Sequence, residues 1–136
     1  MSFTVTYKQI TMPKFNQSVS KIYQENTFDD VKKAYALKRL VEKLEVEQKR
    51  FYEMYSDIQK KFVIKDEKDN EMIDPKRGDE FAKKIEELGN TEITVDWYMV
   101  SLADISEMKL TALEVAMIEP ILDAASVASL QESPQS

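Results

Sequence analysis

Apolar side chains between residues 34 and 62 recur at spacings that alternate regularly between three and four positions. This is the repeat of a coiled-coil seam, in which one side of a helix stays apolar over many turns. The series predicts one amphipathic helix over residues 30–62, and neither glycine nor proline interrupts it before Pro75. Such a helix is about 50 Å long, which is longer than a compact domain of 136 residues is wide. Either a second helix therefore lies along it, or part of it projects from the domain. The positions of this apolar seam are Ala34, Leu37, Val41, Leu44, Gln48, Phe51, Tyr55, Ile58 and Phe62.

Gln48 is the polar member of the seam, and it has two interpretations. It is either a partly exposed position, or a polar residue that fixes register or partner number as buried Asn does in coiled coils. One position does not decide between them. The apolar stretch Phe51–Phe62 beyond it faces only short predicted helices, which leaves it as a candidate uncovered surface.

The remaining elements are short. Residues 3–10 alternate apolar and polar side chains, which predicts a strand with Phe3, Val5 and Tyr7 on one face. The segment 91–100 alternates in the same way, with Ile93, Val95, Trp97 and Met99 in phase. The other predicted elements are a helix over 14–25 (Phe15, Val19, Ile22 and Tyr23 on one face), a small hairpin over 62–75, a helix over 79–88 (Phe81, Ile85 and Leu88) and a helix over 111–119 that starts with a Thr111–Glu114 capping box.

These elements predict a mainly helical α+β fold, in which a small antiparallel sheet joins the two predicted strands. The whole of 1–122 is expected to be one domain, because no repeat or linker divides it. Residues 123–136 are rich in Ala, Ser and Gln and are expected to form a flexible C-terminal tail.

The composition argues against catalysis. The chain has no His, no Cys and only two glycines, Gly78 and Gly89. It therefore lacks the usual general base, the usual transition-metal ligands and a glycine-rich phosphate loop. The acidic loop 66–74 has Lys68 and Glu71 where an EF-hand needs an oxygen ligand and a glycine. We expect no enzyme activity, no cofactor and no metal.

Charge is distributed unevenly along the sequence. Residues 1–65 hold 13 Lys/Arg against 8 Asp/Glu, whereas residues 66–136 hold 6 against 17, which together give the net charge of −6. Such a chain can dock head to tail with itself. Nucleic-acid binding is not expected, because phosphate neutralisation needs a basic surface. The sequence also lacks an apolar run of membrane-spanning length and a signal-peptide pattern, so a soluble intracellular protein is expected.

The order of elements resembles a family of small uncharacterised tailed-phage proteins, encoded among structural and tail genes. The resemblance covers residues 28–122. It rests on the long helix to Phe62, the polar turn after it, and the short helix with Phe81, Ile85 and Leu88. It also rests on three later segments: the strand Glu-Ile-Thr-Val at 92–95, the segment Ser-Leu-Ala-Asp-Ile at 101–105, and the last helix with Ile-Glu-Pro-Ile-Leu at 118–122. The resemblance implies a viral protein, and it carries no catalytic residues to transfer.

Two functions follow as hypotheses. The first is a phage accessory structural or assembly protein that binds another phage structural protein or itself as a homo-oligomer, in the host cytoplasm or within the virion. The alternative is a soluble acidic inhibitor or regulator of a host protein made during infection. The residues predicted to contact a partner are Phe51, Tyr55, Ile58, Phe62, Trp97 and Tyr98.

Overall fold

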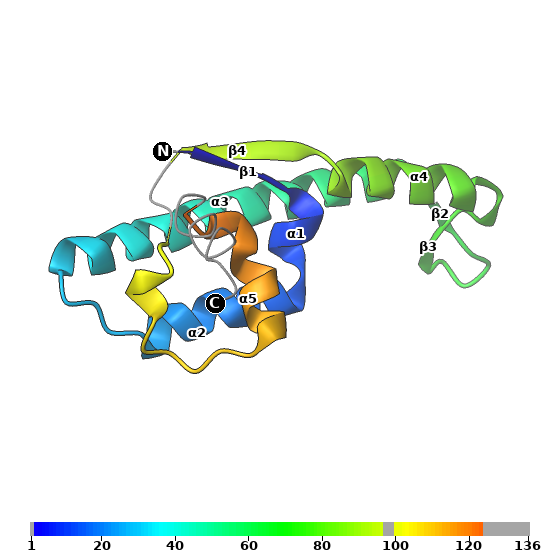
Figure 1. Cartoon of the computed structure of the whole chain (residues 1–136). Coiled ribbons are helices and arrows are strands. Elements are labelled where there is room, and N and C mark those ends of the chain that lie inside the picture. Colours follow the sequence, from blue (N-terminus) through cyan, green and yellow to red (C-terminus); the bar gives the residue numbers. More distant parts are fainter. Residues whose placement is uncertain (1, 97–99, 124–136) are drawn as a thin grey trace, which may run out of the picture.

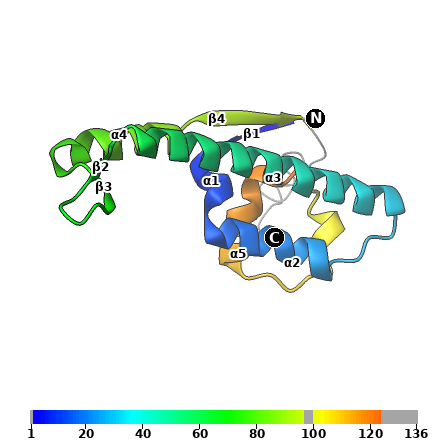
Figure 2. The same cartoon turned by 180° about the vertical axis from the view of Figure 1, so that it is seen from behind.

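A computed structural model describes residues 2–96 and 100–123 of the chain, and it has the expected mainly helical α+β fold. Figures 1 and 2 show α3 running through the molecule, with a two-stranded sheet on one side and shorter helices on the other. The elements are β1 (Ser2–Thr6), α1 (Tyr7–Thr11), α2 (Pro13–Glu25), α3 (Val31–Lys60), β2 (Val63–Lys65), β3 (Glu71–Ile73), α4 (Gly78–Gly89), β4 (Glu92–Asp96) and α5 (Ala112–Ile118).

The long helix α3 is confirmed. Asp30 caps its start, since the Asp30 carboxylate accepts a hydrogen bond from the Lys32 amide at 2.8 Å. Its buried side differs from the predicted seam. Leu40, which the seam omits, has no exposed surface, whereas Ala34, which the seam includes, is exposed. A coiled-coil seam forms against one parallel or antiparallel helix, but here several short elements cross α3, so the buried side follows their positions (Figure 1).

The N-terminal segment corrects one expectation. The strand predicted over residues 3–10 ends at Thr6, and Tyr7 begins α1. The cause is a capping box: the Gln9 amide donates to Thr6 Oγ1 at 3.2 Å, and the Thr6 amide donates to Gln9 Oε1 at 2.8 Å. The turn redirects Tyr7 and Ile10 into the core, where both are buried.

The predicted pairing of the first and last strands is confirmed. β1 and β4 are antiparallel, with Phe3 opposite Val95. Phe3, Val5 and Val95 face the core, while Thr4 and Thr94 lie on the outer face. The strand predicted over 91–100 ends at Asp96 in the described residues, and Trp97, Tyr98 and Met99 lie outside them.

The C-terminal part closes the core. The Thr111–Glu114 capping box begins α5 as predicted, and the Glu114 carboxylate also pairs with Lys21 of α2 at 3.3 Å. Val100 then pairs with Leu122 in an isolated bridge, and both side chains are buried. The buried core residues from Phe3 to Leu122, apart from Phe62 of the arm, form one cluster. The predicted tail beyond Asp123 lies outside the described residues.

The last turns of α3, the hairpin β2–β3 and α4 form an arm that extends beyond the other helices (Figures 1 and 2). The predicted hairpin and helix are both present. Phe81 of α4 packs edge-on against Tyr55, with ring centroids 6.4 Å apart, and against Phe62 at 5.5 Å. In the part of the chain that is described, α3 and the other helices are all too short or too polar to cross a membrane.

The phase of α3 can be tested by truncating one side chain. We expect Leu40→Ala to lower the free energy of unfolding by about 2–5 kcal/mol, because it opens a cavity at a fully buried position. Val46→Ala, on the same helix but 52% exposed, should change it by less than about 0.5 kcal/mol. Urea unfolding of both variants measures the difference, and equal effects would contradict this phase.

A candidate protein-binding groove

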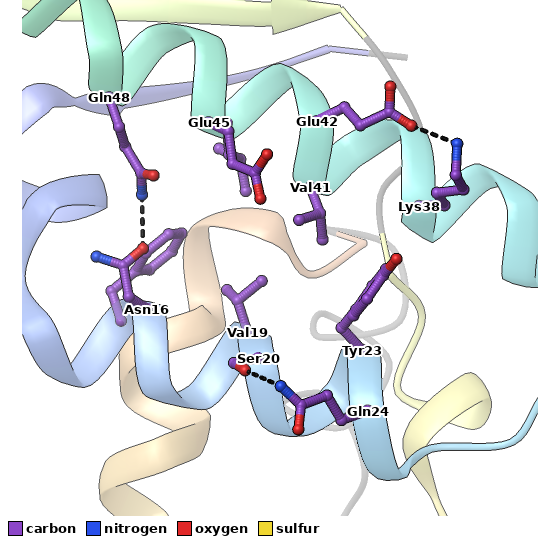
Figure 3. Close-up of a pocket in the computed structure, with 12 residues that line it drawn as sticks. Asn16, Val19, Ser20, Tyr23, Gln24, Lys38, Val41, Glu42, Glu45 and Gln48 are labelled. Carbon is purple, nitrogen blue, oxygen red and sulfur yellow. Dashed lines mark hydrogen bonds and ion pairs between the residues drawn. The ribbon is translucent and has the colours of Figure 1, made fainter.

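A groove of about 560 Å³ lies between α2 and α3. Side chains of both helices, among them Val41 and Tyr23, point into the space between them (Figure 3). The lining residues are Phe15, Asn16, Val19, Ser20, Tyr23 and Gln24 of α2, and Lys38, Val41, Glu42, Leu44, Glu45 and Gln48 of α3.

The floor of the groove is apolar. Phe15, Val19 and Leu44 are buried and belong to the core, with exposed fractions of 1%, 6% and 2%. Val41 is half-buried and packs against that core, so part of its side chain remains open to the groove. A floor of fixed core side chains under a polar rim is the usual composition of a site that recognises apolar side chains of a partner.

The rim on α3 is charged. Lys38 Nζ lies 2.7 Å from Glu42 Oε1, and Arg39 Nη1 lies 3.1 Å from Glu42 Oε2. The hydrogen bond from Lys38 is the main cause that lowers the pKa of Glu42, and the same bond raises the pKa of Lys38. These charges therefore compensate one another. Glu45, one turn further along, is exposed and makes no ion pair with a described residue, so it gives the rim an unbalanced negative charge.

One end of the groove is closed by amide side chains. Gln48 Nε2 donates to the Ile10 carbonyl and to Asn16 Oδ1, both at 2.6 Å, and Asn16 Nδ2 donates to the Met12 carbonyl at 3.2 Å. Gln48 is thus partly buried with partners inside its own chain, and it ties α3 to the corner between α1 and α2. Tyr7 of α1 also donates from its hydroxyl to Glu47 Oε2 at 3.4 Å, so α1 and the corner after it are joined to this turn of α3 at two points.

The other end is flanked by exposed aromatic side chains. Tyr23 of α2 is 47% exposed beside the groove, and Tyr35 of α3 is 58% exposed. Lys38 Nζ lies 5.8 Å from the centre of the Tyr35 ring, within cation–π range. Beyond Gln48, a shallow depression continues along α3 past Tyr52, which is 57% exposed. Exposed tyrosines at both ends are favourable anchors for a protein partner.

Phe51, Tyr55, Ile58 and Phe62, which the sequence predicts as partner contacts, do not line this groove, and the stretch expected to be uncovered is covered within the chain. Phe51 is 9% exposed and Phe62 is 3% exposed, because α1 and α4 cover them. Tyr55 and Ile58 are half-buried against the same cluster. Trp97 and Tyr98 lie outside the described residues.

The sequence prediction missed the groove because it treated each helix separately. Tyr23 was assigned to the buried face of its helix with Phe15, Val19 and Ile22, yet it is exposed. Its position two residues before the end of α2 at Glu25 was the available signal. A groove between two helices depends on their crossing, which spacing within each helix does not give.

The described residues contain no group of three or more His, Cys, Asp or Glu side chains placed to hold a metal ion. The groove instead combines an apolar floor, amide groups and charges, which suits non-covalent binding. Comparison of the chain with known protein families, with curated proteins and with solved structures finds no match.

The closed end of the groove gives a stability prediction. We expect Gln48→Ala to lower the free energy of unfolding by about 1 kcal/mol, because it removes a partly buried hydrogen bond to the Ile10 carbonyl and an exposed one to Asn16. Gln59→Ala is the matched control, since Gln59 is an exposed glutamine on the same helix. Thermal unfolding of the two variants provides the comparison, and an unchanged midpoint for Gln48→Ala would show that the contact is not stabilising.

Proposed function

We propose that this chain is an accessory structural or assembly protein of a tailed phage, which acts without catalysis by holding a segment of another phage protein in the groove between α2 and α3. The open apolar groove flanked by exposed tyrosines is the observation that carries the binding part of the proposal. The resemblance in the order of elements supports the phage part. The protein would act in the host cytoplasm and enter the particle with its partner.

The dimensions of the site favour a short amphipathic helix as the bound segment. From Lys38 to Gln48 the groove follows α3 for about 15 Å at the helical rise. A partner helix of about 11 residues spans that length and can place apolar side chains at i, i+3/i+4 and i+7 on the floor. A basic residue of the partner would lie against Glu45, whose charge is otherwise unbalanced.

A second function, the acidic inhibitor of a host protein, is favoured by the excess of 17 Asp/Glu over 6 Lys/Arg in residues 66–136. The structure of the arm argues against this second function, because its acidic side chains are interspersed with Lys and Arg side chains. Arg77 Nε lies 3.2 Å from Glu80 Oε2, and Lys83 and Lys84 share α4 with Glu86 and Glu87. An inhibitor that mimics an acidic ligand needs a surface of one sign, and its binding would weaken steeply with salt.

Site-specific photocrosslinking tests the proposal. With benzoylphenylalanine at position 23, irradiation of infected cells should link the chain to a protein that mass spectrometry also finds in purified particles or assembly intermediates. The matched control is the same residue at position 113, because Leu113 of α5 is 52% exposed and lies outside the groove. The double variant Tyr23→Ala/Glu45→Arg should reduce the recovered complex at least tenfold, since truncating a tyrosine that anchors a partner costs about 2 kcal/mol.

Three results would oppose the proposal. One is equal crosslinking from positions 23 and 113. A second is normal complex formation by the double variant at unchanged thermal stability. The third combines two observations: the wild type loses its partner between low and moderate salt concentration, and the groove variant binds the partner as well as the wild type does. That result would favour the acidic inhibitor.

A further inference from the structure

One side of α3 faces solvent along the helix, and its middle lies in front of the sheet and of α1 in Figure 2. The side chains of this side recur at alternating spacings of four and three positions, which is how a helix presents a continuous line to a second helix. Tyr35 and Tyr52 are 58% and 57% exposed on it, and Val31 is 81% exposed. The residues of this outer ridge are Val31, Tyr35, Lys38, Glu42, Glu45, Lys49, Tyr52 and Ser56.

The charges in the middle of the outer ridge are of two kinds. Lys38 and Glu42 pair with each other within the chain, at 2.7 Å. Glu45 and Lys49 are exposed and lie one turn apart, and neither makes an ion pair with a described residue. The ridge therefore carries one negative and one positive charge that remain available to a partner, next to each other along the helix.

We infer that a second copy of this chain binds the outer ridge, with the two α3 helices antiparallel about a two-fold axis level with Glu47. Glu45 of each copy then lies opposite Lys49 of the other. One step further from the axis, Glu42 of each copy lies opposite Tyr52 of the other. The two charges that lack an ion pair in the described residues thus meet their opposites twice in one contact.

Charge complementarity selects this register among the antiparallel registers that keep the ridges in contact, which differ by whole heptads. With the second helix shifted by one heptad so that the axis moves toward the N-terminus, Glu42 lies opposite Glu45. Lys38 then lies opposite Lys49, so both contacts bring like charges together. A shift of two heptads pairs Lys38 with Glu42, which already bond to each other within the chain. A shift of one heptad the other way places Glu45 opposite Ser56, where no opposite charge meets it.

The length of the contact also favours a second copy. In this register residues 34–60 of the two helices overlap, which is about 40 Å at the helical rise. A partner helix of equal length is needed to cover that distance, and α3 of a second copy provides it. The arrangement is isologous and closes with two chains. Because its ion pairs are exposed to solvent, the dimer is weak and weakens further as salt is added.

Charge reversal tests this register. Glu45→Lys and Lys49→Glu should each raise the dissociation constant of the dimer at least tenfold, because each variant replaces two attractive contacts with two repulsive ones. An equimolar mixture of the two variants should associate at least as well as the natural chain, since each ridge charge of one variant then meets its opposite on the other. Glu86→Lys and Lys83→Glu are the matched controls, because they make the same charge changes at exposed positions of α4. They should leave association unchanged, alone or mixed.

Sedimentation of the purified chain at low salt measures the association. The mass of the natural chain should rise from 15.8 kDa toward twice that value with increasing protein concentration. Circular dichroism should show the same helix content in all the variants. A strictly monomeric natural chain, single variants that associate as well as the natural chain, or a mixture that stays monomeric would each overturn the inference.

Glu45 also borders the groove between α2 and α3. A second copy and a partner helix therefore compete for its carboxylate, a consequence that rests on the proposed function. The sedimentation measurement contains no partner, so its failure leaves the proposed function standing. Failure of the crosslinking from position 23 likewise leaves the dimer standing.

Discussion

The rest of the structure depends on one interaction, the packing of the buried side of α3 against the elements that cross it. The leucines of this side are Leu37, Leu40 and Leu44. The N-terminal strand, the helices α1 and α2, and the segment that ends at Leu122 share one core with this side of α3. Each of those elements is too short to hold an apolar face by itself, since isolated helices shorter than about 15 residues are marginal in water. The long helix therefore acts as the surface on which both ends of the chain assemble.

The same helix is longer than the body that covers it, and the arm follows from this mismatch. Beyond Phe51 the shorter helices of the body no longer reach α3, so Tyr55, Ile58 and Phe62 require another cover. α4 provides it through Phe81, and Arg77 completes it by lying over Phe62. The hairpin is the link between the two helices of the arm, and it is left with apolar residues that neither helix covers. The groove and the exposed apolar residues of the hairpin are thus consequences of one helix that is covered unequally along its length.

The sequence predicted the elements better than their contacts. The long helix, the Thr111 cap and the strand pairing all depend on local spacing or on hydrophobic alternation, and all are present. The turn at Tyr7 was missed although Thr6-x-x-Gln9 has the same capping pattern as Thr111-x-x-Glu114. Leu40 was missed because a heptad series assumes a helical partner, whereas the actual cover is a set of crossing elements. The groove depends on the angle between α2 and α3, which neither helix encodes separately.

Gln48 connects the fold to the proposed function. An amide at a helix position among apolar residues costs stability unless its hydrogen bonds are made, and here it bonds to the Ile10 carbonyl and to Asn16. These bonds set the separation of α2 and α3 at one end, so the floor formed by Phe15 and Leu44 is fixed before any partner arrives. A site held in this way loses little conformational entropy on binding. The polar residue that interrupts the apolar seam therefore makes the groove a preformed site.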